Sequence, residues 1–167
     1  MNIKNILLVE DDPRDVDMTL AALEEYNLAN KVVVVHDGGE ALDYLYYRGK
    51  FETRAIGFPV VVMLDLKMPK VNGLEVLKTI KADEHLKVIP VVVLSSSRET
   101  PDLVECYKHG VNAYVVKPVD FVEFIKAVKH LGLFWAAINE PPPLIGTEET
   151  SMQSDEVISP GKEAGCQ

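Results

Sequence analysis

The sequence has little of what secreted, membrane-spanning or disulfide-stabilised proteins need. Its 167 residues include only two cysteines, Cys106 and Cys166, which form neither a disulfide framework nor a metal-binding cysteine motif. No apolar stretch approaches the roughly 18 residues of a membrane span, and the N-terminus lacks the long apolar region and cleavage site of a secretory signal. We therefore expect a cytoplasmic protein with no membrane partner.

Positive charge is also scarce. The chain carries 17 lysine and arginine residues against 26 aspartate and glutamate residues, which gives a formal net charge of -9. Nucleic acids and anionic membrane surfaces repel such a chain. The composition therefore argues against nucleic acid as a partner and favours proteins or small cations.

What the sequence does contain is a series of short apolar runs that alternate with helix-like segments. The runs are rich in β-branched residues and mostly unbroken, which is typical of parallel strands covered on both faces. They span residues 5–10, 31–35, 60–64, 88–94 and 113–117. This alternation predicts an α/β fold with a five-stranded parallel sheet and helices on both faces.

Helix-start signals mark the segments between these runs. Asp12 reads as a helix cap and Pro13 as a first-turn proline, and Thr100 with Pro101 repeats that signal. The expected helices span residues 13–26, 39–47, 74–82, 101–109 and 120–138.

The same pattern sets the expected domain boundary. Residues 1–140 are predicted to form one domain with an extended last helix. Residues 141–167, with little apolar periodicity, are predicted to form a disordered tail. Residues 48–58 make a longer connection than such a unit usually needs, and we expect them to form a surface excursion.

Chemically active side chains follow the carboxyl ends of four predicted strands. They are Glu10, Asp11, Asp12, Asp65, Ser95, Ser96, Ser97 and Lys117. In an open parallel sheet these strand ends meet at one edge, where ligands bind. Carboxylates gathered there repel one another unless a cation intervenes. Mg²⁺ suits this edge, because it binds one or two carboxylates and keeps positions for water and phosphate oxygens.

This cluster favours phosphoryl chemistry. Asp65 stands alone at the end of its strand and is the best candidate for a covalent acceptor, while Glu10 and Asp11 would hold the metal. A lysine facing the acids would pair with a phosphate, and a serine hydroxyl could donate to it. Asp12 is most simply a helix cap. A single acid at a strand end is often only a solvated turn residue, but four strand ends with complementary chemistry are harder to explain in that way.

The blocks that carry these residues resemble the signature of the response-regulator receiver family. They are "ILLVEDD", "VVMLDLKMPKVNGLEVL", "IPVVVLSSS" and "AYVVKP", in the family's usual order, and the resemblance covers about residues 6–128. It implies a flavodoxin-like, doubly wound five-stranded parallel sheet with strand order 2-1-3-4-5.

The resemblance also implies roles for the acids. Asp65 resembles the aspartate that accepts a phosphoryl group from a histidine kinase, and Glu10 and Asp11 resemble the acidic pair for Mg²⁺. The main-chain carbonyl of Lys67 would be a further metal ligand. The implied protein is a signalling protein and not a substrate-turning enzyme.

A switch is implied as well. Ser95 falls at the hydroxyl position that moves toward the phosphoryl group, Lys117 at the lysine that pairs with it, and Tyr114 at the aromatic switch position. The surface formed by the fourth helix, fifth strand and fifth helix would then change shape. The family carries a cis Lys117–Pro118 bond at this place.

The partners follow from the same resemblance. The chain shows no pattern of an output domain, so we expect a single-domain regulator. The connection at residues 48–58 and the extended last helix resemble the subgroup paired with bacteriophytochrome-type histidine kinases. Phe134 and Trp135 lie past the point where most receivers end, and we expect a homodimer contact through the last strand and helix or a fold-back onto the domain.

Other interpretations fit parts of this pattern. A haloacid-dehalogenase-type phosphatase needs a second acid two residues after the nucleophile, where this chain has Lys67. A flavodoxin-like cofactor binder needs a phosphate loop after the first strand, where the acids Glu10 and Asp11 would repel a phosphate. A receiver that acts only as a scaffold would not need the complete set of acids, hydroxyl and lysine.

Overall fold

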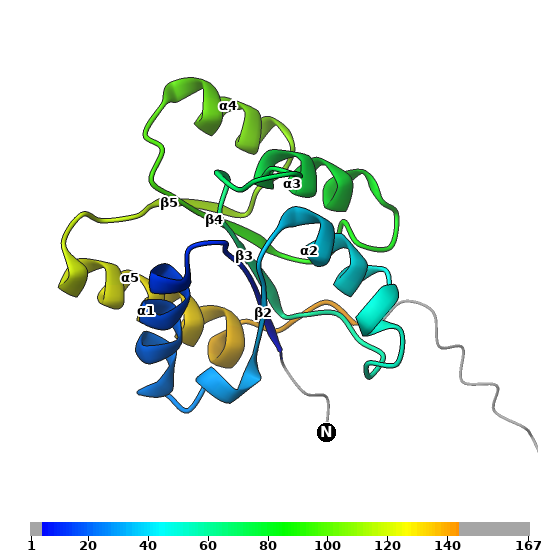
Figure 1. Ribbon diagram of the computed structural model, residues 1–167, viewed down its shortest axis with the longest axis horizontal. Coiled ribbons are helices and arrows are strands. Elements are labelled where there is room, and N and C mark those ends of the chain that lie inside the picture. The colour runs from blue at the N-terminus through cyan, green and yellow to red at the C-terminus, as the bar shows by residue number, and fades with distance from the viewer. Residues whose placement is uncertain (1–4, 144–167) are drawn as a thin grey trace, which may run out of the picture.

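A parallel β-sheet forms the centre of the protein, in a computed structural model that describes residues 5–143 except the side chain of Asn30 (Figure 1). Its strands are β1 (Ile6–Val9), β2 (Val32–Val35), β3 (Val61–Leu64), β4 (Val91–Ser95) and β5 (Ala113–Val116). The strand order is β2-β1-β3-β4-β5, and every neighbouring pair is parallel. The predicted fold class and strand order are confirmed.

Helices cover both faces of the sheet (Figure 1). One face carries α1 (Pro13–Glu24) and α5 (Phe121–Leu133), and the other carries α2 (Gly38–Leu45), α3 (Gly73–Ala82) and α4 (Thr100–Lys108). Successive residues of a strand point to opposite faces, so Leu7 enters the core beneath α2 and α3 while Leu8 enters the core beneath α1 and α5. Two covered faces explain why the strands read as unbroken apolar runs.

The start of α1 agrees with the predicted helix cap, and the start of α4 does not. Asp12 caps α1, where its Oδ1 accepts a hydrogen bond of 2.8 Å from the Arg14 N–H. Thr100 does not cap α4: it is the first residue of the helix, and Glu99 precedes it without a side-chain cap bond. The helix therefore begins one residue earlier than a Thr100 cap requires.

The connection at residues 48–58 lies at the surface, as expected, and is anchored to α2. The Arg54 guanidinium lies 4.0 Å from the ring centre of Tyr44 and 3.8 Å from that of Tyr47. Its Nε donates to the Tyr44 carbonyl at 2.8 Å, and its Nη1 donates to the Gly57 carbonyl at 3.0 Å. One side chain thus joins both ends of this connection.

Replacing Arg54 with alanine is expected to lower the free energy of unfolding by about 2 kcal/mol, because stacking between two rings and the carbonyl hydrogen bonds are lost together. Urea unfolding measures the change. Arg48→Ala is the matched control, since Arg48 is exposed and lies over one ring only, that of Tyr46, at 4.5 Å. Equal losses in the two variants would show that Arg54 does not anchor the connection.

The last helix continues past Leu133 into a π-helical turn, η3 (Phe134–Ile138). Trp135 is partly buried against the core beneath α1 and α5, which confirms the predicted fold-back for this residue. Phe134 remains 46% exposed and meets the Trp135 ring edge-on at 5.0 Å. Most of the predicted tail, from residue 144 onward, lies outside the described residues. Within residues 5–143, no helix is long and apolar enough to cross a membrane.

Candidate functional site

The carboxyl ends of β1, β3 and β5 and the first turn of α1 bring one lysine and several acids together. The Lys117 Nζ donates to the Glu10 Oε2 at 2.6 Å, to the Asp15 Oδ2 at 2.6 Å and to the Asp65 Oδ2 at 3.2 Å. Its side chain is 11% exposed. The sheet edge therefore gathers the predicted residues Glu10, Asp65 and Lys117 into one cluster, as the strand-end pattern indicated.

Three carboxylates of this edge could hold a metal ion. Glu10, Asp11 and Asp65 each offer an oxygen, and these oxygens lie within 4.8 Å of one another. Glu10 and Asp65 are buried, while Asp11 is exposed. Two buried carboxylates beside an exposed one suit a hard divalent cation that keeps some of its bound water molecules. The donor set present in this chain therefore fits such an ion.

Burial shapes the charges of the cluster. It raises the pKa of Glu10 to about 7, although the hydrogen bond and the charge of Lys117 act in the opposite direction. Burial also acts to lower the pKa of Lys117, but hydrogen bonds to Asp15 and Glu10 and the charge of Asp65 outweigh it and raise that pKa above its usual value. The lysine is therefore held as an ammonium ion among the acids.

The turn after β3 fixes Asp65. Its N–H donates to the Val9 carbonyl at 3.0 Å, which extends the pairing of β3 with β1 by one residue. Its Oδ1 accepts from the Lys67 N–H at 3.2 Å. The first residue of α3, Gly73, packs so closely on this turn that a Cβ there would lie 2.1 Å from the Asp65 carbonyl oxygen. The backbone at Asp65 is therefore held from two sides.

The side chains of Ser95 and Tyr114 both form hydrogen bonds with the backbone of Ser97. The Ser95 hydroxyl is fully buried and accepts from the Ser97 N–H at 3.2 Å. The Tyr114 hydroxyl donates to the Ser97 carbonyl at 3.1 Å. Within the described part of the chain, no hydrogen bond joins the Ser95 side chain to the acids. The structure thus links the two predicted switch residues to each other rather than to Asp65.

Asp15 belongs to this cluster but was not among the predicted site residues. This residue lies in the first turn of α1, and its side chain, 24% exposed, makes one of the two shortest contacts with Lys117. Because α1 directly follows β1, its first turn lies at the same sheet edge as Glu10. No distinct signal in the sequence indicates this contact, because an acid in a first helical turn is ordinarily explained by the helix dipole.

The expectation of a cis Lys117–Pro118 bond is wrong for this structure, because the described peptide bonds are all trans. A proline amide prefers trans by only about 0.5–1 kcal/mol, so tertiary contacts decide the isomer. Here the Lys117 ammonium contacts three carboxylates with the bond in the trans form.

The chain matches known proteins over most of its length. Residues 6–129 match the response regulator receiver domain family. Response regulator Rcp1 of Synechocystis sp. is 35% identical over 132 residues, which cover 79% of this chain and 88% of Rcp1. Its Mn²⁺-bound crystal form has a TM-score of 0.78 at 34% identity and covers 84% of this chain and 99% of that one.

Two further solved structures are similar. The bacteriophytochrome response regulator AtBRR is 59% identical with a TM-score of 0.67, and the match covers 84% of this chain and 100% of that one. The phosphorylated cyanobacterial phytochrome response regulator RcpA is 38% identical with a TM-score of 0.78, and the match covers 84% and 99%.

These matches place the chain in the receiver family rather than with the phosphatases or the flavodoxin-like cofactor binders. Receiver-domain response regulators are signalling proteins and not classical substrate-turning enzymes. Receiver domains of phytochrome response regulators partner with histidine kinases. With its sheet of order 2-1-3-4-5 and its acid cluster at the carboxyl edge, this chain belongs to the response regulator receiver family of two-component signalling.

Proposed function

We propose that this receiver domain accepts a phosphoryl group on the Asp65 carboxylate from a sensor histidine kinase, in a reaction that requires Mg²⁺. The observation that carries the proposal is that Asp65 belongs both to the three-carboxylate cluster and to the contacts of Lys117. In the transfer, an Asp65 oxygen bonds to phosphorus as the bond from phosphorus to the kinase histidine breaks, and the histidine leaves as imidazole.

Glu10, Asp11 and Asp65, with the main-chain carbonyl of Lys67, would hold the ion. When bound, Mg²⁺ would supply positive charge against the phosphoryl oxygens. The Mn²⁺-bound form of a similar protein supports the binding of a divalent ion. The exposed side chain of Asp11 and the buried side chains of Glu10 and Asp65 leave one side of the cluster open to the donor.

Lys117 and Ser95 would bind the transferred group. The Lys117 ammonium already lies 3.2 Å from the Asp65 carboxylate, so it is placed to pair with a phosphoryl oxygen. The phosphoryl group carries a charge of about -1.5 to -2 at pH 7, which favours a shift of the Ser95 hydroxyl toward its oxygens. Because Ser97 joins Ser95 to Tyr114, this shift would reach the aromatic switch.

The surface of α4, β5 and α5 is the proposed output. Several large apolar side chains at this surface are exposed, which is typical of interaction sites. They are Val104, Tyr107, Val119, Phe121 and Val122. A change in the loop between β4 and α4 would alter the surface that these side chains form.

The proposed kinase partner is of bacteriophytochrome type, because bacteriophytochrome response regulators are among the similar proteins. We also propose a homodimer through the last strand and helix, supported by the exposed side chains of Phe134 and Ile138. The net charge of -9 supports a protein that does not bind nucleic acid. A cytoplasmic location agrees with phosphotransfer from a kinase domain.

Intact-mass measurement after incubation with acetyl phosphate and Mg²⁺ tests the proposal. Wild type is expected to gain one phosphoryl group, and Asp65→Asn or removal of the metal with EDTA is expected to abolish the gain. Asp12→Asn is the matched control, since asparagine caps a helix as well as aspartate does and the variant should still be modified. A mass gain that persists in Asp65→Asn would assign the acceptor elsewhere. Wild type that neither gains mass nor binds beryllofluoride would refute the proposal.

A further inference from the structure

Ser97 is a buried junction between three elements. It is 3% exposed, and each of its polar groups contacts a different part of the fold. Its N–H donates to the Ser95 hydroxyl of β4, its carbonyl accepts from the Tyr114 hydroxyl of β5, and its own hydroxyl donates to the Asp102 Oδ2 of α4 at 2.5 Å. A hydrogen bond to a carboxylate is stronger than one between neutral groups. The contact with Asp102 is therefore the strongest of the three.

The helix at the other end of this contact is weakly packed. The structure gives α4 one buried side chain, Cys106, whereas α1, α2 and α3 each have four buried residues. The side chain of Asp102 lies in the first turn of α4, one turn before Cys106. A helix with so few buried contacts can change position at a low cost in packing.

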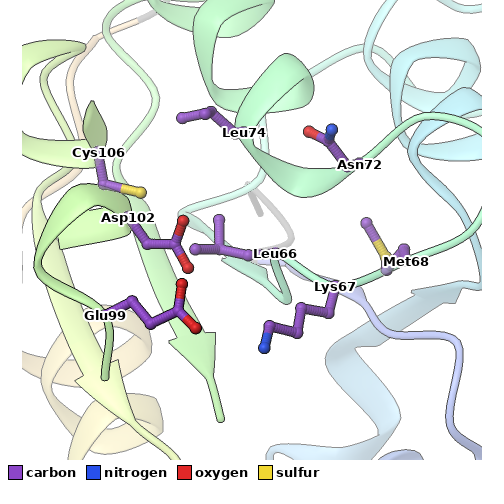
Figure 2. Close-up of a pocket in the computed structure, with 8 residues that line it drawn as sticks. All are labelled: Leu66, Lys67, Met68, Asn72, Leu74, Glu99, Asp102 and Cys106. Atoms are coloured by element: carbon purple, nitrogen blue, oxygen red, sulfur yellow. The ribbon is translucent and has the colours of Figure 1, made fainter. Parts of the chain in front are cut away.

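A cavity of about 490 Å³ separates the start of α4 from the loop after β3. Glu99 and Asp102 line one side, and Leu66 and Lys67 line the other (Figure 2). This space leaves the N-terminal turn of α4 without packing against that loop. Two hydrogen bonds join the start of α4 to Ser97 at the end of β4. The Ser97 hydroxyl donates to the Asp102 carboxylate at 2.5 Å and accepts from the Glu99 N–H at 3.3 Å, and the shorter bond, to the carboxylate, is the stronger.

We propose that Asp102 is a positioning residue that couples α4 to the phosphorylation site through Ser97. The proposal rests on the phosphorylation of Asp65 proposed above. For the Ser95 hydroxyl to reach a phosphoryl oxygen, its contact with the Ser97 N–H must change. Ser97 then moves with Asp102 attached, and α4 follows. The bond between Ser97 and Asp102 is the physical link by which one site biases the other.

Hydrogen exchange of the unphosphorylated protein tests whether this bond holds α4. Ser97→Ala and Asp102→Ala are each expected to speed exchange of the amides of α4 roughly tenfold to hundredfold, as for the loss of a hydrogen bond to a charged group. The double variant should exchange no faster than Asp102→Ala alone, because the bond between the two residues is already lost in that variant. Asp102→Ala also removes a carboxylate that interacts favourably with the dipole of α4. Ser97→Ala keeps that carboxylate, so faster exchange in Ser97→Ala reports the loss of the hydroxyl's hydrogen bonds alone. Additive effects, or no effect of Ser97→Ala, would overturn the link.

Beryllofluoride with Mg²⁺, a phosphoryl mimic, tests the coupling itself. In wild type it is expected to change hydrogen exchange in α4, and in Asp102→Ala it should still bind but leave α4 unchanged. Asp102→Asn should retain the response, because its amide oxygen can still accept from Ser97. Glu105→Ala is the control on the same helix, since Glu105 pairs only with Lys108 and His109 in the described contacts.

The failures of the two proposals are distinguishable. If wild type neither gains mass with acetyl phosphate nor binds beryllofluoride, the phosphorylation of Asp65 is refuted, and the coupling with it. If Asp102→Ala binds beryllofluoride and α4 responds as in wild type, the coupling alone is refuted. A response lost in Asp102→Ala and retained in Asp102→Asn and Glu105→Ala would establish Asp102 as the coupling residue.

Discussion

Replacing Lys117 with methionine is expected to lower the free energy of unfolding of the metal-free protein by about 3–5 kcal/mol, the usual result of removing one partner from a buried ion pair. Methionine keeps much of the apolar stem but leaves Glu10, Asp15 and Asp65 without the ammonium ion that contacts all three. Mg²⁺ is expected to restore part of the loss, because it would supply positive charge to Glu10 and Asp65, two of these three carboxylates. Urea unfolding with EDTA and with Mg²⁺ measures both effects.

Lys81→Met is the matched control for this experiment. The Lys81 ammonium is also partly buried, but it donates only to neutral oxygens. These are the carbonyls of Lys87 and Ile89 and the Oδ1 of Asn112. Its replacement should also lower stability, and Mg²⁺ should not restore it. If Mg²⁺ stabilises wild type and Lys117→Met equally, the carboxylates around Lys117 are not the metal site.

Gly73→Ala is expected to lower the free energy of unfolding by about 3 kcal/mol, at the upper end of the effects of overpacking. The new Cβ would lie 2.1 Å from the Asp65 carbonyl oxygen and 2.8 Å from the Leu66 Cα, and backbone atoms cannot turn away as the end of a side chain can. Relief of this contact must move α3 or the turn that holds Asp65. Phosphorylation by acetyl phosphate should therefore fall along with stability.

Gly39→Ala is the control, because this glycine also lies in the first turn of a helix. Its nearest neighbour is the Oδ1 of Asp37 at 3.1 Å, the end of a side chain that can shift slightly. Alanine favours helix over glycine, so no net loss of stability is expected there. Unfolding and intact-mass measurements on both variants give the comparison. Equal losses would mean that close packing against Asp65 is not what requires glycine at position 73.

The sheet and much of the candidate site could be predicted because both follow from local pattern. Unbroken apolar runs such as residues 60–64 identify strands that are covered on both faces, and the residue after each run then lies at the carboxyl edge. Glu10, Asp65 and Lys117 were found in this way, and the structure joins them through direct contacts. The strand order came from the family resemblance rather than from periodicity.

Contacts between segments without a repeating pattern could not be predicted. An acid in a first helical turn, such as Asp15 or Asp102, is ordinarily explained by the helix dipole, and only the fold shows that one reaches Lys117 and the other Ser97. Arg54 lies in the predicted surface excursion, and nothing in the sequence indicates that its guanidinium packs on two tyrosine rings. These side chains act across the fold, where spacing along the chain carries no signal.

The contact between Glu10 and Lys117 has a consequence for the protein during its synthesis. Its two residues are 107 positions apart in the chain, which corresponds to roughly 5–20 s of translation at about 5–20 residues per second. Until Lys117 is synthesised, the carboxylates of Glu10, Asp15 and Asp65 have no ammonium partner, and β5 has not yet paired with β4. Chains that terminate before β5 therefore lack the ammonium ion as well as the edge strand, and we expect quality-control proteases to remove them before they can compete for a kinase.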